Sequence, residues 1–381
     1  MALVAIIFLA IILVSIILGK GLFFKTYSKL LIAALILLLS FLVLLFFTAI
    51  HSIDVLDNAK DYGEIGPYGD YIGGILNPLI AVFAVFAAGF AFYAQYEANK
   101  QVQDQFKIQQ FESQFFEMLR LHKENVNEMK ITGYDSVIQE TLDNEKKVVQ
   151  IVRSHNTKII EGRKVFVSMV VKLISCYEFL EEINSTWRVR YDPVDLLKLS
   201  YRIFFFGSNS ELIILEKIDV DFIDHVKKQL RKHRKRHRDS YSRKNVYQGL
   251  NKKIELFIKY SPFTGHENRL GHYYRHLYST VKYVVNKERE GLIDYKQSRG
   301  YLKILRSQMS NDEQLMLYYN YIIGFGKDWE NDGYLTKYRM LHNLPIDKVK
   351  YAENPRVHFQ EYINSIKPGE GHLFEWGDVE Q

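Results

Sequence analysis

Three histidines, two arginines and three tyrosines fall within the thirteen residues of segment 266–278. His272 and His276 are four residues apart, so they lie on one face if the segment is helical. One imidazole could then accept a proton while the other donates one, and Arg269 or Arg275 could neutralise phosphate charge. These four residues are candidate catalytic residues for metal-independent cleavage of RNA.

The same segment allows two other interpretations. An i,i+4 histidine pair can bind a metal ion, but no carboxylate or third histidine at the spacing of a closed site accompanies it. Alternatively, the tyrosines pack in a core and the histidines hydrogen-bond to backbone carbonyls. Signature motifs of nucleotide hydrolases, dinucleotide enzymes, serine esterases and zinc proteases are absent from the sequence, and Cys176 is its only cysteine. We therefore predict neither a metal nor a cofactor.

A second charged feature is the run 227–238, in which eight of twelve residues are lysine or arginine. Its charges would fall on every face of a helix, so we predict that this helix is not buried. A solvated surface segment is one interpretation, and a surface that binds nucleic acid or anionic lipid is the other. The basic residues are Lys227, Lys228, Arg231, Lys232, Arg234, Lys235, Arg236 and Arg238.

The elements that would position these residues begin with an apolar N-terminal region. The stretches at about 2–18, 30–50 and 73–95 contain no charged residue, and each approaches the roughly 20 residues that a transmembrane helix needs. We predict a membrane anchor over 1–96 with three transmembrane helices, so a lipid bilayer is the first expected partner. The first stretch lacks the basic start and the cleavage site of a signal peptide, and we expect it to be retained.

The charges between these stretches predict their orientation. Lys20, Lys25 and Lys29 lie between the first two stretches without any acidic residue, whereas five acidic residues and only Lys60 lie between the second and the third. Basic residues favour the cytoplasmic side of a membrane. We therefore predict a multi-pass protein with its N-terminus outside and the chain after Tyr96 in the cytoplasm. That part holds 46 of the 50 basic and 39 of the 44 acidic residues.

Beyond the third stretch the helical pattern continues almost without interruption. We predict an all-α fold, with a helical stalk over 97–130 and a helical cytoplasmic domain over 131–381. Pro78 is expected in the first turn of the stalk helix, and Gly271 just before a helix that starts at Tyr273. No strand-like alternation is evident. The predicted helices are Glu140–Val152, Lys164–Asn184, Pro193–Phe206, Val220–Arg238, Asn251–Tyr260, Tyr273–Lys287, Tyr295–Gln308, Asp312–Gly324 and Leu335–Asn343.

The third stretch and the stalk also suggest self-association. Small residues recur on one face of the stretch, including Ala84 and Ala88, and such faces let helices approach closely. Apolar residues recur at helical spacing in the stalk, including Phe106 and Phe115. We predict a homo-oligomer interface at these four residues. The alternative is a stalk that packs against its own chain.

Four segments of the chain match a known pattern in series. They are Gly66–Pro78; Phe111–Phe116 with Leu119 and His122; Gly271–Tyr278 with Lys282 and Tyr283; and Leu305–Ser310 with Glu313 and Tyr318–Asn320. In this order they resemble the phage abortive infection proteins of the AbiC-like family, over about Gly66 to Leu344. The first two apolar stretches and the basic run 227–238 are not part of the pattern.

The resemblance implies a bacterial defence protein, anchored in the inner membrane, that stops phage propagation by arresting or killing the infected cell. It assigns no chemistry to any residue. One mechanism is an oligomeric effector that perturbs the bilayer. A second is a ribonuclease, since helical ribonucleases of other abortive infection families carry an Arg-x(4–6)-His motif and Arg269 and His276 fit it. A third is a non-catalytic sensor or scaffold. RNA or a phage-derived trigger would be a further partner.

Overall fold

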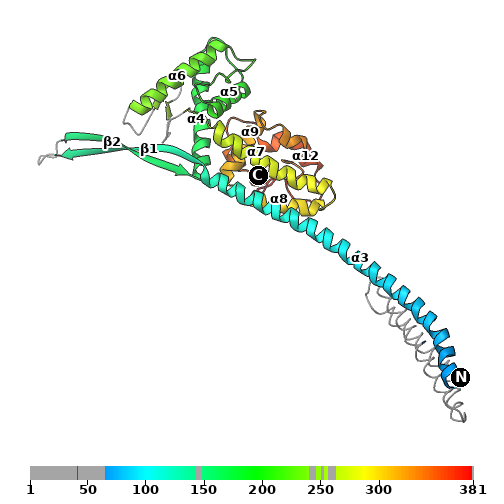
Figure 1. Cartoon of the computed structure of the whole chain (residues 1–381). Coiled ribbons are helices and arrows are strands. Elements are labelled where there is room, and N and C mark those ends of the chain that lie inside the picture. Colours follow the sequence, from blue (N-terminus) through cyan, green and yellow to red (C-terminus); the bar gives the residue numbers. More distant parts are fainter. Residues whose placement is uncertain are drawn as a thin grey trace. The chain divides into compact units, whose positions relative to one another are not determined.

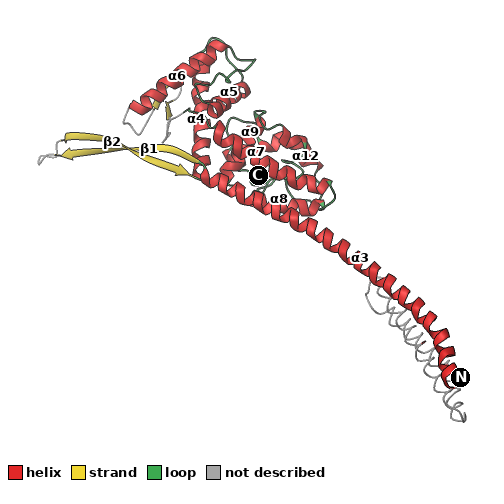
Figure 2. Cartoon of the chain, in the orientation of Figure 1, coloured by secondary structure: helices red, strands yellow, loops and turns green. Residues whose placement is uncertain are grey.

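The structure is a computed structural model that describes residues 41, 65–142, 148–239, 246–249, 253–255 and 263–379. The chain forms two compact units, Met1–Lys107 and Ile108–Gln381. The predicted spans at 2–18 and 30–50 lie outside the described residues, apart from Phe41. The described part is mostly helical, as Figure 2 shows, so the predicted all-α class is confirmed in part.

The first described element is the long helix α3, which runs without a break from Ile65 to Glu128. Among the described residues, one helical segment, Ile80–Glu128, is long and apolar enough to cross a membrane by length and composition. Pro78 was expected in the first turn, but α3 begins at Ile65 and Pro78 lies inside it. That expectation was wrong because the helix extends further toward the N-terminus than the apolar pattern indicated.

From Ile108 onward, α3 packs against the rest of its own compact unit. One face of this part of α3 is buried. Its residues are spaced by four, seven and four positions, as one face of a helix requires: Phe111, Phe115, His122 and Val126. Phe115 was predicted at an oligomer interface, and the structure corrects this. Its ring is fully buried and lies 5.2 Å, centroid to centroid, from that of Tyr301 in the same chain.

A long β-hairpin follows α3 where the sequence predicted helix Glu140–Val152. Strands β1 (Lys130–Leu142) and β2 (Val148–Glu161) pair antiparallel, with Lys130 opposite Glu161; the hairpin is the pair of yellow arrows in Figure 2. Both segments are rich in valine, isoleucine and threonine, whose branched Cβ atoms favour strands over helices. This composition explains why the helix prediction was wrong.

The helices of the second unit confirm most of the predicted helices. Their bounds are α4 (Lys164–Thr186), α5 (Pro193–Phe206), α6 (Val220–Asp239), α7 (Glu267–Arg289), α8 (Tyr295–Ser307) and α9 (Asn311–Ile322). Short helices follow: α10 (Asp328–Asn331), η2 (Ile346–Lys348), α11 (Pro355–His358) and α12 (Gln360–Ser365). Helix α4 packs against α5 and α9, and α7 packs against α8 (Figure 1).

Two further helix predictions were wrong. The predicted helix Asn251–Tyr260 overlaps strand β4 (Lys253–Glu255), which pairs with β3 (Val246–Gln248). The predicted helix Leu335–Asn343 is a series of turns. In these turns Leu335, Tyr338, Met340 and Leu341 are all buried along with most of their neighbours, so the segment has no solvent-facing side of the kind a surface helix needs.

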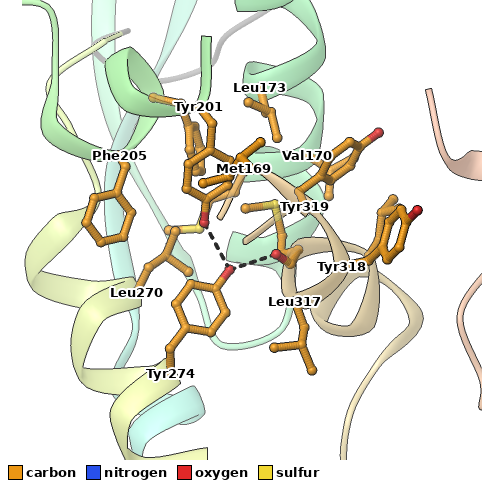
Figure 3. Packing of buried hydrophobic residues seen from close by; sticks show 14 of the residues in the cluster. Met169, Val170, Leu173, Tyr201, Phe205, Leu270, Tyr274, Leu317, Tyr318 and Tyr319 are labelled. Atoms are coloured by element: carbon orange, nitrogen blue, oxygen red, sulfur yellow. Dashed lines mark hydrogen bonds between the residues drawn. The ribbon is translucent and has the colours of Figure 1, made fainter. Parts of the chain in front are cut away.

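Several buried tyrosines in the core of the second unit have hydrogen-bonded hydroxyl groups. Tyr274 of α7 points toward Tyr201 of α5, with 3.5 Å between the hydroxyl oxygens, and donates to the backbone oxygen of Met316 at 3.0 Å (Figure 3). Asn320 of α9 donates to the Tyr201 hydroxyl at 3.0 Å. Buried hydroxyl groups need hydrogen-bond partners. Here the partners come from different helices, so the hydrogen bonds join α5, α7 and α9.

Candidate functional site

Helix α7 carries the predicted catalytic histidines and turns both toward α3. The Nε2 atom of His276 lies 2.9 Å from the backbone oxygen of Met118, and that of His272 lies 3.3 Å from the side-chain oxygen of Asn125. A backbone oxygen only accepts hydrogen bonds, so Nε2 of His276 carries a hydrogen and donates it. The two histidines therefore share one helix face, as the spacing indicated.

The predicted arginines do not converge with the histidines on one point. Arg269 is exposed, and its Nε donates to the backbone oxygen of Lys130 at 2.9 Å. Arg275 is exposed as well. Helix α7 begins at Glu267, so Gly271 lies inside it and not before its start. The atoms nearest to a Cβ atom placed at Gly271 belong to the side chain of Arg275, the first at 3.5 Å, so no close approach of another backbone segment requires a glycine there.

Behind this helix face lies a buried histidine that the prediction did not include. His122 of α3 is 1% exposed, and within the described part of the chain neither of its ring nitrogens has a hydrogen-bond partner. Its ring stacks on that of His276, with centroids 6.2 Å apart, and lies 5.4 Å from the ring of Tyr273. A buried polar group without a partner is costly and calls for an explanation.

The neighbouring tyrosine leads to a buried carboxylate. Tyr273 of α7 donates to Glu313 of α9 at 3.1 Å. The other oxygen of Glu313 accepts from the backbone nitrogen of Ser310 at 2.7 Å and from its hydroxyl at 2.6 Å, which completes a capping box at the start of α9. Arg163, just before α4, places its Nε 3.9 Å from the same oxygen. The cluster thus joins α3, α7, α9 and the start of α4.

Burial sets the protonation of this cluster. It lowers the pKa of His122 from 6.5 to about 4, with smaller electrostatic contributions from His276 and Arg163, so this imidazole is neutral at pH 7. Burial also raises the pKa of Glu313, although the bonds from Ser310 and Tyr273 oppose that rise. The pKa of the Tyr273 hydroxyl is well above its usual value because of burial and the adjacent Glu313.

A second buried base lies at the entry to α7. The backbone passes close to itself there, because a Cβ atom at Gly265 would lie 2.7 Å from the backbone oxygen of Phe206. Gly265 also has a φ of 88°, which favours glycine. The crossing places His266 beside the fully buried Lys172 of α4, with 3.2 Å between Nε2 and Nζ. Burial, followed by the charges of Lys172 and Arg269, lowers the pKa of His266 well below 6.5.

These arrangements indicate which chemistry is available. No group of three histidine, cysteine, aspartate or glutamate residues that could hold a metal ion occurs in the part of the chain that the structure describes. The neutral imidazole of His122 could accept a hydrogen bond if a small shift of α3 against α7 brought a donor such as the Tyr273 hydroxyl into line. The cluster is therefore suited to respond to movement of α3.

Sequence reasoning missed His122 and Glu313 as site residues, although a signal for both was present. Each belongs to one of the segments that resemble the abortive infection family. In the structure those segments meet, since His122 contacts Tyr273 and Tyr273 bonds to Glu313. A histidine or glutamate isolated in the sequence gives no indication of such distant neighbours.

The basic run 227–238 occupies the second half of α6. We predicted that this helix is not buried, but its Leu230 and His233 are buried, and the ring of His233 lies edge-on to Phe179. Lys227 is half-buried, and its Nζ donates to the backbone oxygen of Ser210 at 2.9 Å. Lys228, Arg231 and Lys232 are exposed, while the side chains of Arg234, Lys235, Arg236 and Arg238 lie outside the description.

The remaining predicted interface residues lie on α3 in the first compact unit. Ala84 and Ala88 are exposed, and Phe106 is 65% exposed. Unlike Phe115, these three residues are accessible on the surface of the described chain. They remain predicted contacts for a second copy.

Comparison with known proteins identifies one family. Residues 265–349 match the sequence model of a family described as putative phage abortive infection protein, which confirms the resemblance to the AbiC-like family. The match covers all of α7, α8 and α9, and so includes His276, Tyr273 and Glu313. No curated protein matches the chain. No solved structure matches it either.

Proposed function

From the family match over residues 265–349, we propose that this phage-defence protein is a membrane-anchored effector of abortive infection. In this proposal the C-terminal helical region responds to infection, and the apolar part of α3 acts on the bilayer to arrest or kill the cell. The cluster of buried His122, Tyr273 and Glu313 with half-buried His276 couples the two. We call these four residues the coupling cluster.

The observation that carries the proposal is the continuity of α3. One helix contains both the apolar segment and the residues that bind the family-matched region. The latter contacts include the bond from His276 to Met118 and the bond from the Tyr301 hydroxyl to Glu112, at 2.6 Å. A change in how α7 and α8 hold α3 would therefore act directly on the helix that carries the apolar segment.

Localisation follows from the same proposal. The bulk of the chain is expected in the cytoplasm of a bacterium and the N-terminus outside, because basic residues favour the cytoplasmic side. Topology reporters fused after Lys29, Lys60 and Lys100 should read inside, outside and inside. An inside signal at Lys60 would contradict this topology, because the third span would then be absent.

Self-association is part of the proposed mechanism. Small residues such as Ala84 and Ala88 allow helices from different chains to pack closely in lipid. The exposure of both residues and of Phe106 leaves this face open to a second copy. Phe115 is not included, because its own chain covers it.

A ribonuclease is the second candidate function. It is favoured by one observation, the exposure of Arg269, His272 and Arg275 at three-residue intervals along α7. Such a stripe is accessible to an RNA backbone, and its arginines could contact phosphates. One observation argues against it. The Nε2–H group of His276 donates a hydrogen bond to the backbone oxygen of Met118, as expected for a structural histidine. The two functions differ in what fails first in the cell, the membrane or the RNA.

A further inference from the structure

Two nearly buried arginines lie together where α8 ends against the turn segment 333–344. Arg306 is 8% exposed and Arg339 is 6% exposed. Arg306 donates from Nη1 to the backbone oxygen of Arg339 at 2.9 Å, and Arg339 donates from Nη2 to the backbone oxygen of Gly371 at 3.0 Å. The Nε atoms of both arginines are buried and have no hydrogen-bond partner among the residues that the structure describes. Each guanidinium group thus retains donor capacity that no described residue uses.

The backbone of Arg339 is held in an unfavourable conformation. Its φ of 55° lies in the left-handed region, which residues with a Cβ atom rarely adopt. Backbone strain of this kind persists where the surroundings over-determine it, and it occurs often at ligand sites. Here it lets one residue present its carbonyl group to Arg306 and its own guanidinium group toward Gly371.

Positive charge gathers around this pair, and no buried carboxylate of the described residues forms an ion pair with it. Burial lowers the pKa of Arg306 to about 10, and the positive charges of Arg299 and Arg339 contribute to that shift. Neither Arg306 nor Arg339 forms an ion pair with a carboxylate among the described residues. Glu375 acts in the opposite direction on Arg306, but it is exposed and accepts a hydrogen bond from Asn343 at 2.7 Å.

We propose that Arg306 and Arg339 form a binding site for the phosphate group of a small ligand. Guanidinium groups bind phosphate oxygens through parallel hydrogen bonds, and two of them match the charge of a phosphate dianion. Both side chains are less than a tenth exposed, so the backbone of a nucleic acid or a bilayer surface is too bulky to reach them. A terminal phosphate, either free or as a monoester, fits this degree of burial. This site does not depend on the proposed membrane function.

Isothermal titration calorimetry on the purified full-length chain in non-ionic detergent tests this proposal. The probes are inorganic phosphate and adenosine monophosphate, each compared with chloride at equal ionic strength. We expect saturable binding of phosphate to the wild type. Tighter binding of the monophosphate would identify a phosphorylated small molecule as the ligand class, and equal binding would identify free phosphate.

Arg339→Gly is the decisive variant, because glycine adopts a φ of 55° without strain and the fold is retained. We expect it to weaken phosphate binding at least tenfold, and Arg306→Gln to do the same. Arg188→Ala removes an exposed arginine elsewhere and should leave binding unchanged. The proposal is wrong if the wild type shows no saturable binding, or if both Arg306→Gln and Arg339→Gly bind phosphate as the wild type does.

Discussion

Replacing Phe115 with alanine is expected to lower the free energy of unfolding by about 3–5 kcal/mol. Phe115 belongs to α3, and its ring is fully buried. The ring centroid lies 5.2 Å from that of Tyr301 in α8 and 6.4 Å from that of Phe111 in α3. Truncation would leave a cavity in the contact that holds α3 to the family-matched region. Urea unfolding of the full-length chain, followed by circular dichroism, measures the effect.

Phe106→Ala is the matched control, because Phe106 lies on the same helix but is 65% exposed. Its free energy of unfolding should change by less than about 0.5 kcal/mol. If Phe106 contacts a second copy as proposed, this variant should instead weaken crosslinking between chains. Equal destabilisation by the two substitutions would contradict the distinction between a buried and an exposed residue on α3.

Replacing His122 with leucine is expected to abolish phage protection while leaving the protein folded at pH 7. Leucine has a volume close to that of histidine, and no hydrogen bond to a described residue is lost because neither ring nitrogen makes one. Substituting an apolar group of similar shape for such a polar group is close to neutral or stabilising. Plaque counts on cells that express equal amounts of each protein measure protection.

The same substitution should change how stability depends on pH. The pKa of His122 is about 4 in the folded state and 6.5 without burial. Between these values the unfolded state binds a proton that the folded state does not, so stability falls as pH decreases from about 6.5 to 4. The wild type should lose about 3 kcal/mol over this window through His122, and His122→Leu should lack that loss.

Urea unfolding at pH 7, 6 and 5 separates the two roles of His122. At pH 5 the leucine variant should be more stable than the wild type by about 2 kcal/mol. An identical pH profile for both proteins would mean that the imidazole is not buried as a neutral group. A changed profile with full phage protection would show that His122 only fills space, and the coupling cluster would lose its proposed role.

How far the sequence predicted the fold depended on local signals. Helix α5 was predicted with its observed bounds, because Asp192 caps its start, Pro193 occupies the first turn and Gly207 ends it. The segments of β1 and β2 lack the hydrophobic alternation that predicts a strand, and their strand signal is instead their content of β-branched residues. The pairing partner of each strand lies in another segment, which periodicity alone does not show.

The candidate site was harder to predict, since it depends on contacts between distant segments. The spacing of His272 and His276 correctly placed them on one helix face. It could not show that this face lies against α3, or that Met118 would accept the hydrogen bond from His276. The turn segment containing Arg339 was predicted as helix for a similar reason. Burial on nearly all sides and a strained backbone are tertiary features.

The central claim is that the chain acts through the membrane. It is tested most directly by inducing the full-length chain in bacteria without phage and following membrane potential and total RNA integrity together. We predict early depolarisation while RNA remains intact. Early RNA fragmentation in cells whose membrane stays polarised would contradict the account and favour the ribonuclease.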